Sequence, residues 1–130
     1  MLKRVAAIIL NDKKVLMVTG PEADFYWTPG GMIDKSESSK QALSRELREE
    51  LRVMPKNIKE YFTYQGYKLE TGKPMEVVCF LADYEGSLIP DHEVSSYMWY
   101  SRSHFDKKSP RLFYMIEEIL IPKLIEDDLL

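Results

Sequence analysis

The sequence of 130 residues lacks several features on which whole classes of protein depend. It contains a single cysteine, Cys79, so no disulfide can form within the chain. Cys79 lies in the apolar run 77–81, which favours a buried structural thiol over a reactive nucleophile. No apolar run approaches the length of a membrane span, and no signal peptide opens the chain. We therefore expect a cytoplasmic protein with no membrane partner.

An excess of positive charge is also missing. The 18 basic and 21 acidic residues are interspersed and give a net charge of −3. A nucleic-acid-binding protein would carry a basic face, so a nucleic acid duplex is not an expected partner. A small anionic ligand fits this balance only where positive charge is supplied locally, as a bound metal ion would do. The two histidines, His92 and His104, are expected to be exposed loop residues and not metal ligands.

Internal repeats and low-complexity tracts are absent, and 45% of the residues are hydrophobic, which argues against disorder. The length suits one domain, residues 1–130, with its own core. One helix is predicted from Ser38 or Ser39 to Leu51, and another from Ser109-Pro110 onward, bent or broken at Pro122. A hairpin turn is predicted at residues 11–13 and another turn at residues 70–74. β-rich patterns predict strands at residues 5–10, 14–18, 25–28, 58–67, 75–84 and 97–100.

The most informative feature is a group of three glutamates near the end of the first predicted helix. Glu46, Glu49 and Glu50 fall within one arc of that helix, because positions i, i+3 and i+4 are neighbours. Each like-charged i,i+4 pair costs roughly 0.2–0.5 kcal/mol, and the helix dipole is already negative at this end. A cation would reverse both penalties. Ligands that offer only oxygen point to a hard ion, Mg²⁺ or Mn²⁺.

On its own, an E-x-x-E-E pattern is typical of an acidic face in contact with solvent, and its surroundings favour a site instead. The turn Pro29-Gly30-Gly31 lets the backbone approach a ligand without interference from Cβ atoms. Glu37 and Arg45 have a spacing that allows them to pair and brace this loop against the helix. An apolar stripe beside the acidic arc places the glutamates at the edge of the core, and it consists of Leu43, Leu47 and Leu51.

Residues 31–53 have the spacing G-x5-E-x7-R-E-U-x-E-E-x-G-U, where U is an aliphatic residue. The matching residues are Gly31, Glu37, Arg45, Glu46, Leu47, Glu49, Glu50 and Val53. This pattern is the Nudix box, and the preceding Trp27-Thr28-Pro29-Gly30 is similar to the W-x-P-G lead-in of the same family. The chain thus resembles the Nudix hydrolases. The resemblance implies an α/β fold, namely an α/β/α sandwich with a mixed β-sheet between helices.

One position departs from the family pattern. Arg52 stands where the family has a glycine, which would end the helix in a left-handed conformation. That conformation costs roughly 1–2 kcal/mol for a residue with a Cβ atom. We therefore predict that Arg52 continues the helix slightly further, until Pro55 forces it to stop.

The resemblance also implies roles for the residues of the box. Glu46, Glu49 and Glu50, with the carbonyl of Gly30, would hold one or more Mg²⁺ or Mn²⁺ ions next to a substrate that lies against Gly30 and Gly31. Arg45 and Glu37 would orient the carboxylates. The group that takes the proton from water is left open. Within the box it is Glu46 or Glu49, and on a later loop the best candidate is Glu93.

The implied reaction is Mg²⁺-dependent hydrolysis of a nucleoside diphosphate linked to another moiety. The short chain most resembles the MutT-like enzymes, which predicts a nucleoside or deoxynucleoside triphosphate as substrate and a nucleoside monophosphate and pyrophosphate as products. The alternatives are an ADP-sugar or dinucleoside polyphosphate hydrolase and a non-catalytic nucleotide-binding module. Oligomeric state stays open, with a homodimer among the possibilities.

A nucleotide site also needs an apolar wall for the base and cations for the phosphates. Aromatic candidates for the wall are Phe25, Tyr26, Phe113 and Tyr114, whereas Trp27 and Trp99 are expected in the core. Candidate phosphate-binding cations are Lys3, Arg4, Lys68 and Arg111. The sequence alone does not select among these four.

Overall fold

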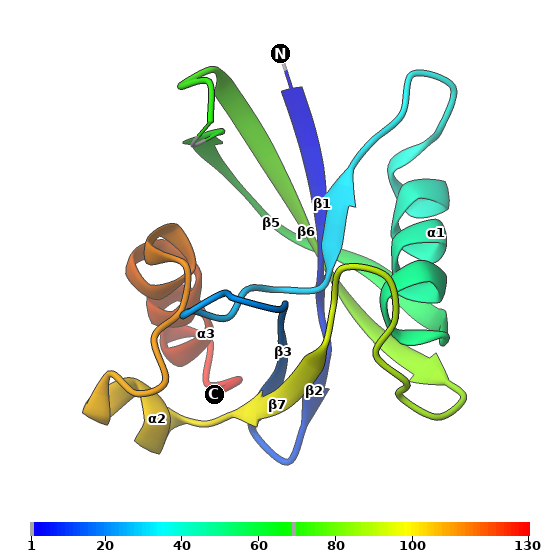
Figure 1. Ribbon diagram of the computed structural model, residues 1–130. Coiled ribbons are helices and arrows are strands. Elements are labelled where there is room, and N and C mark those ends of the chain that lie inside the picture. Colours follow the sequence, from blue (N-terminus) through cyan, green and yellow to red (C-terminus); the bar gives the residue numbers. More distant parts are fainter. Residues whose placement is uncertain (1, 69) are drawn as a thin grey trace.

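The computed structural model describes residues 2–68 and 70–130, and its strands lie between a helix on one side and the C-terminal helix on the other (Figure 1). This is the predicted α/β/α sandwich. The described strands form a sheet in the order β4-β1-β6-β5 and a second sheet in the order β2-β3-β7. β1 runs parallel to β6 and antiparallel to β4, so the first sheet is mixed. The strands are β1 (Leu2–Ile8), β2 (Leu10–Asn11), β3 (Lys14–Thr19), β4 (Gly30–Met32), β5 (Met54–Tyr67), β6 (Pro74–Glu85) and β7 (Ser96–Tyr100).

The first predicted strand passes from one sheet to the other. β1 ends at Ile8 and β2 begins at Leu10, and the carbonyl of Ile9 accepts a hydrogen bond from Leu16 at 2.9 Å. The predicted hairpin after it is confirmed. Asp12 and Lys13 both have positive φ angles, as the tight turn between two antiparallel strands requires.

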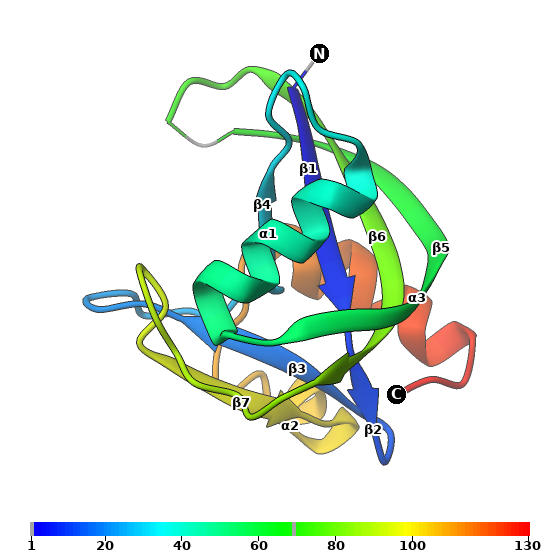
Figure 2. The same ribbon diagram turned by 90° about the vertical axis from the view of Figure 1, so that its right-hand side faces the viewer.

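α1 (Ser39–Leu51) lies across β1 (Figure 2) and begins where the sequence predicts. The Ser38 side chain accepts a hydrogen bond from the Gln41 amide, and the Gln41 side chain accepts one from the Ser38 amide. The helix buries its leucine stripe against alternate residues of β1. That side of the core contains Val5, Ala7, Ile9, Leu43, Leu47 and Leu51.

The prediction that Arg52 extends this helix is wrong. Arg52 itself adopts the left-handed conformation, with φ 56° and ψ 36°. In that turn the amides of Arg52 and Val53 donate back to the carbonyls of Arg48 and Leu47, at 3.1 and 3.5 Å. Val53 thereby enters the core and β5 begins at the next residue. The core contact and the recovered hydrogen bonds outweigh the steric cost at Arg52.

The C-terminal helix covers the other face of the first sheet, where it packs on Ala6 and Ile8. Its start was predicted wrongly at Ser109-Pro110. Residues 111–113 are extended instead, because the Tyr26 amide donates to Arg111 and the Phe113 amide donates to Tyr26. A short helix that the sequence analysis did not predict, α2 (Arg102–Lys107), precedes this segment.

Pro122 does not end the C-terminal helix. The π-helical turn Ile116–Leu120 leads directly into α3 (Ile121–Glu126), and the Ile121 amide donates to the carbonyl of Ile116. Proline has no amide hydrogen to donate, and the wide turn before it lets the helix pass this position without a break. No helix that the structure describes is long and apolar enough to cross a membrane.

Candidate active site

The site is built around Gly30 and Gly31 in β4, which pass close to α1. The Gly30 amide donates a hydrogen bond of 3.1 Å to a carboxylate oxygen of Glu50. A Cβ atom at Gly30, whose φ is +144°, would lie 2.0 Å from the carbonyl oxygen of Val5, and one at Gly31 would lie 2.4 Å from the carboxylate of Glu46. Glycine at position 31 therefore lets the strand lie directly against Glu46 of the helix, and glycine at position 30 lets it lie against the backbone of β1.

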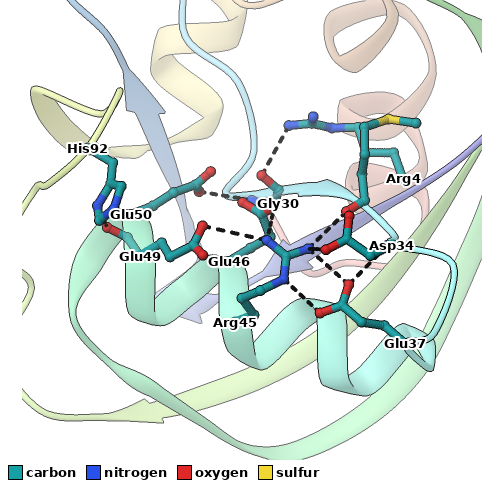
Figure 3. Close-up of polar contacts among 10 residues, drawn as sticks. Arg4, Gly30, Asp34, Glu37, Arg45, Glu46, Glu49, Glu50 and His92 are labelled. Carbon is teal, nitrogen blue, oxygen red and sulfur yellow. Dashed lines mark hydrogen bonds and ion pairs between the residues drawn. The ribbon is translucent and has the colours of Figure 1, made fainter.

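Arg45 connects the loop before α1 to the acidic residues (Figure 3). Its guanidinium donates two hydrogen bonds to Glu37, at 2.6 and 2.9 Å, and one of 2.9 Å to Glu46. It also donates to the carbonyl of Met32 at 3.1 Å and lies 3.5 Å from the Glu49 carboxylate. The hydrogen bond from Arg45, with a second from the Asp34 amide, lowers the pKa of Glu37 to about 2. The predicted brace between loop and helix is thus present.

Two of the three box glutamates are removed from solvent. Glu50 is 2% exposed and Glu46 8% exposed. Burial raises the pKa of Glu50 to about 8, against the opposing effect of the hydrogen bond from Gly30. Burial likewise raises the pKa of Glu46, although Arg45 acts in the opposite direction. Buried carboxylates with raised pKa values are poorly compensated charges, and such groups gather at functional sites.

Glu93 is brought to the same place by a loop that docks on the C-terminal end of α1. The Asp91 amide donates to the carbonyl of Glu50 at 2.9 Å, and the His92 ring lies 2.9 Å from the carbonyl of Glu49. The Arg52 side chain donates to the Asp91 carboxylate at 2.9 Å. The contacts of Asp91 and His92 with Glu50 and Glu49 involve carbonyls at the helix end, which have no partner within the helix.

The other side of this loop contacts the end of β3 and the residue that follows it. The Ser95 amide donates to the carbonyl of Thr19 at 2.9 Å. A Cβ atom at Gly20 would lie 2.5 Å from the carbonyl oxygen of Glu93. The backbone of Glu93 therefore lies between the end of β3 and the end of α1.

A cavity of about 540 Å³ extends from these carboxylates over the face of the first sheet that the C-terminal helix covers. Gly30, Gly31, Glu46, Glu50 and Glu93 line one part of it. Apolar and aromatic side chains line another part, from four separate segments of the chain: Phe25, Trp27, Tyr64, Tyr67, Met75, Val77, Phe113, Met115 and Ile116. The cavity has the composition of a ligand site, with apolar walls and a few polar groups at defined positions.

The NUDIX domain family model matches residues 1–119, most of the chain. The chain belongs to the Nudix family. The family and fold predicted from the Nudix box are confirmed.

Two curated Nudix relatives match different lengths of the chain. The NAD-capped RNA hydrolase NudC of Vibrio atlanticus is 29% identical over 110 residues, which are 82% of this chain and 39% of that protein. The CTP pyrophosphohydrolase of Escherichia coli is 44% identical over 57 residues, which are 41% of this chain and 42% of that protein. The matches thus span about two fifths of the length of these curated relatives.

A solved structure is similar over nearly the whole chain. The NUDIX domain of Shewanella oneidensis NrtR, complexed with ADP ribose, superposes with a TM-score of 0.74 at 27% identity. The match covers 98% of this chain and 88% of that one.

The structure assembles most of the predicted Nudix site residues and separates two from the cavity. Gly30, Gly31, Arg45, Glu46, Glu50 and Glu93 all line it. Glu37 does not line the cavity and contacts Arg45, which does. Glu49 points to Arg45 at the edge of the site, and its side chain is 37% exposed.

Several lining residues were not predicted. Trp27 was expected in the core and instead lines the cavity, although it packs against both core clusters. Tyr26 and Tyr114 are not among the lining residues, whereas Phe25 and Phe113 are. The sequence near Met75 and Met115 gives no indication of their role, because their contribution depends on strand pairing and on where the last helix packs.

Cys79 is buried, as predicted, and burial raises the pKa of its thiol to about 12.

Nudix hydrolases generally use divalent metal ions, and the donor set here is chemically suited to one. The carbonyl of Gly30 and the carboxylates of Glu46 and Glu50 are hard oxygen donors in or near the same cavity. Among residues 2–68 and 70–130, no three acidic, histidine or cysteine side chains are already gathered around a common point. In the structure Arg45 pairs with Glu46 at 2.9 Å and with Glu49 at 3.5 Å.

Proposed function

We propose that this chain hydrolyses a pyrophosphate bond in a nucleoside diphosphate linked to another group, with Mg²⁺ as the preferred ion. A nucleoside or deoxynucleoside triphosphate is the leading substrate, and water converts it to a nucleoside monophosphate and pyrophosphate. The observation that carries the proposal is a single cavity that joins buried carboxylates to an apolar, aromatic wall. A polyphosphate would lie at the first part and a base at the second.

The charge of the cavity supports the need for a cation. Its described lining includes five acidic residues, Asp34, Glu46, Glu50, Glu70 and Glu93, and three basic ones, Arg4, Arg45 and Lys68. Arg45 is already neutralised by Glu37 and Glu46. With these carboxylates ionised, the lining would repel a polyphosphate. Bound divalent ions would reverse the local sign, shield the phosphate oxygens and lower the pKa of bound water.

The residues of the chain divide the remaining tasks. Glu46, Glu49, Glu50 and the carbonyl of Gly30 are the proposed ion ligands. Glu49 must turn away from Arg45, and its long 3.5 Å pair and partial exposure make that turn inexpensive. Arg45 stays fixed by Glu37 and keeps the helix carboxylates oriented.

Glu93 is the proposed general base that takes a proton from the attacking water. It lines the cavity with Glu46 and Glu50, yet it comes from a different element and does not share the contact of Glu46 with Arg45. Glu46 and Glu49 are the alternatives from the box. Glu93→Gln distinguishes these cases. Loss of the base lowers kcat and leaves the affinity for the ion nearly unchanged, whereas loss of an ion ligand lowers kcat and the affinity for the ion.

The substrate is tested with a Mg²⁺-dependent panel of nucleotides, in which phosphate is measured with and without an added phosphatase and an added pyrophosphatase. Triphosphates release pyrophosphate, which is the expected result. The NAD-capped RNA hydrolases among the relatives favour a dinucleotide as the second candidate, and such a substrate would yield two monophosphates. Absence of turnover on the whole panel, with binding retained, would instead indicate a non-catalytic nucleotide-binding module.

A further inference from the structure

The four candidate phosphate-binding cations predicted from the sequence differ in their position relative to the cavity. Lys3 is 3.9 Å from Glu76 and does not line the cavity. Arg111 lies 3.2 Å from the buried carboxylate of Glu117, also outside the lining. Arg4 and Lys68 do line the cavity, and Lys68 comes from the turn between β5 and β6. The choice is thus reduced to two residues.

Arg4 is the one next to the carboxylates. In β1 it pairs with Met32 of β4, two positions from the pairing of Ala6 with Gly30, so its side chain extends beside the glycine strand. Its guanidinium reaches the carbonyl of Gly30 at 3.5 Å, the long limit of a hydrogen bond (Figure 3).

Its charge has no strong partner. Within residues 2–68 and 70–130, no carboxylate lies at ion-pair distance from Arg4, in contrast to Arg45 and Arg52. Arg4 is half-buried, and it lines the cavity together with Tyr64. A partly desolvated guanidinium with one weak contact has several donors available for an incoming anion, and its planar fork suits a phosphate.

We propose that Arg4 binds a phosphate group of the substrate between the ion site and the apolar wall. This inference rests on the proposed function and names the residue that would fix the polyphosphate chain in the cavity. Arg4 would exchange its weak contact with the Gly30 carbonyl for phosphate oxygens, which also leaves that carbonyl free for the ion.

The test measures binding and not turnover. Wild type, Arg4→Gln, Arg4→Lys and Lys3→Gln are titrated calorimetrically, in the presence of Mg²⁺, with the α,β-methylene analogues of the four common nucleoside triphosphates and with the matching nucleosides. Lys3→Gln is the matched control, because it removes the neighbouring charge on the same strand outside the cavity. Thermal unfolding of each variant verifies that it is folded.

For the analogue that wild type binds best, we expect Arg4→Gln to raise Kd about 10- to 100-fold, the usual effect of losing hydrogen bonds to a charged group. Arg4→Lys should recover part of the loss, Lys3→Gln should stay within twofold of wild type, and nucleoside binding should not change. Equal analogue binding by wild type and Arg4→Gln would overturn the proposal, as would a wild type that binds none of the analogues. If the wild-type protein binds an analogue but cleaves no triphosphate, the proposed hydrolysis is refuted. The comparison of wild type with Arg4→Gln then still tests whether Arg4 binds a phosphate. If Arg4→Gln does not fold, Arg4→Lys decides the inference, and wild-type affinity in that variant contradicts phosphate binding by the guanidinium.

Discussion

The guanidinium of Arg52 lies 2.9 Å from the carboxylate of Asp91, so the residue that replaces the family's glycine ties the end of α1 to the loop that carries Glu93. A glycine would turn the helix equally well but has no side chain to reach this loop. Two further contacts, from the Asp91 amide to Glu50 and from His92 to Glu49, join the same two segments. In this chain three contacts thus join the end of the helix to the loop.

Arg52→Gly should therefore separate stability from activity. We expect the melting temperature to stay constant or rise, because relief of the left-handed strain outweighs the loss of an exposed ion pair. We expect kcat to fall several-fold with little change in KM, because Glu93 loses part of its anchoring. Arg48→Ala, at an exposed site on the outer face of α1, is the control. Unchanged kcat in Arg52→Gly would show that the ion pair does not position Glu93, and a large loss of stability would show that the helix end is misunderstood.

Glu49→Gln and Glu50→Gln should each lower kcat by orders of magnitude without preventing folding, because both are proposed ion ligands.

The two substitutions should differ in their effects on stability. The pKa of Glu50 is raised to about 8 by burial, so wild type without metal progressively loses stability between about pH 4.5 and 8, as the buried group is forced to ionise. At pH 9 the metal-free Glu50→Gln protein should melt above wild type, whereas the more exposed Glu49→Gln should not. Thermal unfolding with a chelator measures this difference, and full activity in both variants would refute the assigned ligands.

Glu37 gives the opposite dependence on pH. Its pKa is lowered to about 2 by the hydrogen bonds from Arg45 and the Asp34 amide, so the pair stabilises the folded protein above the ordinary carboxylate pKa of about 4.5. This stabilisation is lost as the pH falls from about 4.5 to 2. We expect Glu37→Gln to be less stable than wild type at pH 7 and to approach it at pH 2. Urea unfolding at both values tests the prediction, and a constant difference across this range would contradict it.

Gly20→Ala tests the contact on the other side of the Glu93 loop. The added methyl group would lie 2.5 Å from the Glu93 carbonyl, so the backbone must move. Such overpacking typically costs about 1–3 kcal/mol, and displacement of Glu93 should also lower kcat. Gly66→Ala is the comparison at the apolar wall of the cavity, because its methyl group meets only the end of the flexible Met115 side chain, and it should change KM more than kcat. If kcat falls equally in both variants, the position of Glu93 is not the cause.

Features coded by neighbouring residues were predictable from the sequence. The Ser38 cap, the hairpin at Asp12 and Lys13 and the Nudix box each depend on short spacings. The order of the strands does not, and β4 was missed as a strand because two of its three residues are glycines held by pairing with distant β1. The start of the last helix was misplaced for the same reason, since the pairing of Tyr26 with Leu112 overrides a good local start signal at Pro110.

At the site too, local features were predictable from the sequence, and features that depend on distant segments were not. The acidic residues of α1 and the glycine strand were found because the motif is local. Arg4, Met75 and Met115 come together only through the parallel pairing of β1 with β6 and the docking of the C-terminal helix. At Arg52 the sequence indicated strain correctly, but it could not reveal that core packing of Val53 decides where the helix ends.

The two parts of the cavity come from different stretches of the chain. Residues 30–50 and Glu93 provide the carboxylate part, whereas much of the apolar wall comes from β5, β6 and the segment that begins the C-terminal helix. Under the proposed function, exchange of wall residues, for example at Met75 or Met115, would therefore alter which nucleotides are accepted without touching the proposed ion ligands and base. A scaffold of this kind can diversify its specificity by substitution while the hydrolytic chemistry is inherited unchanged.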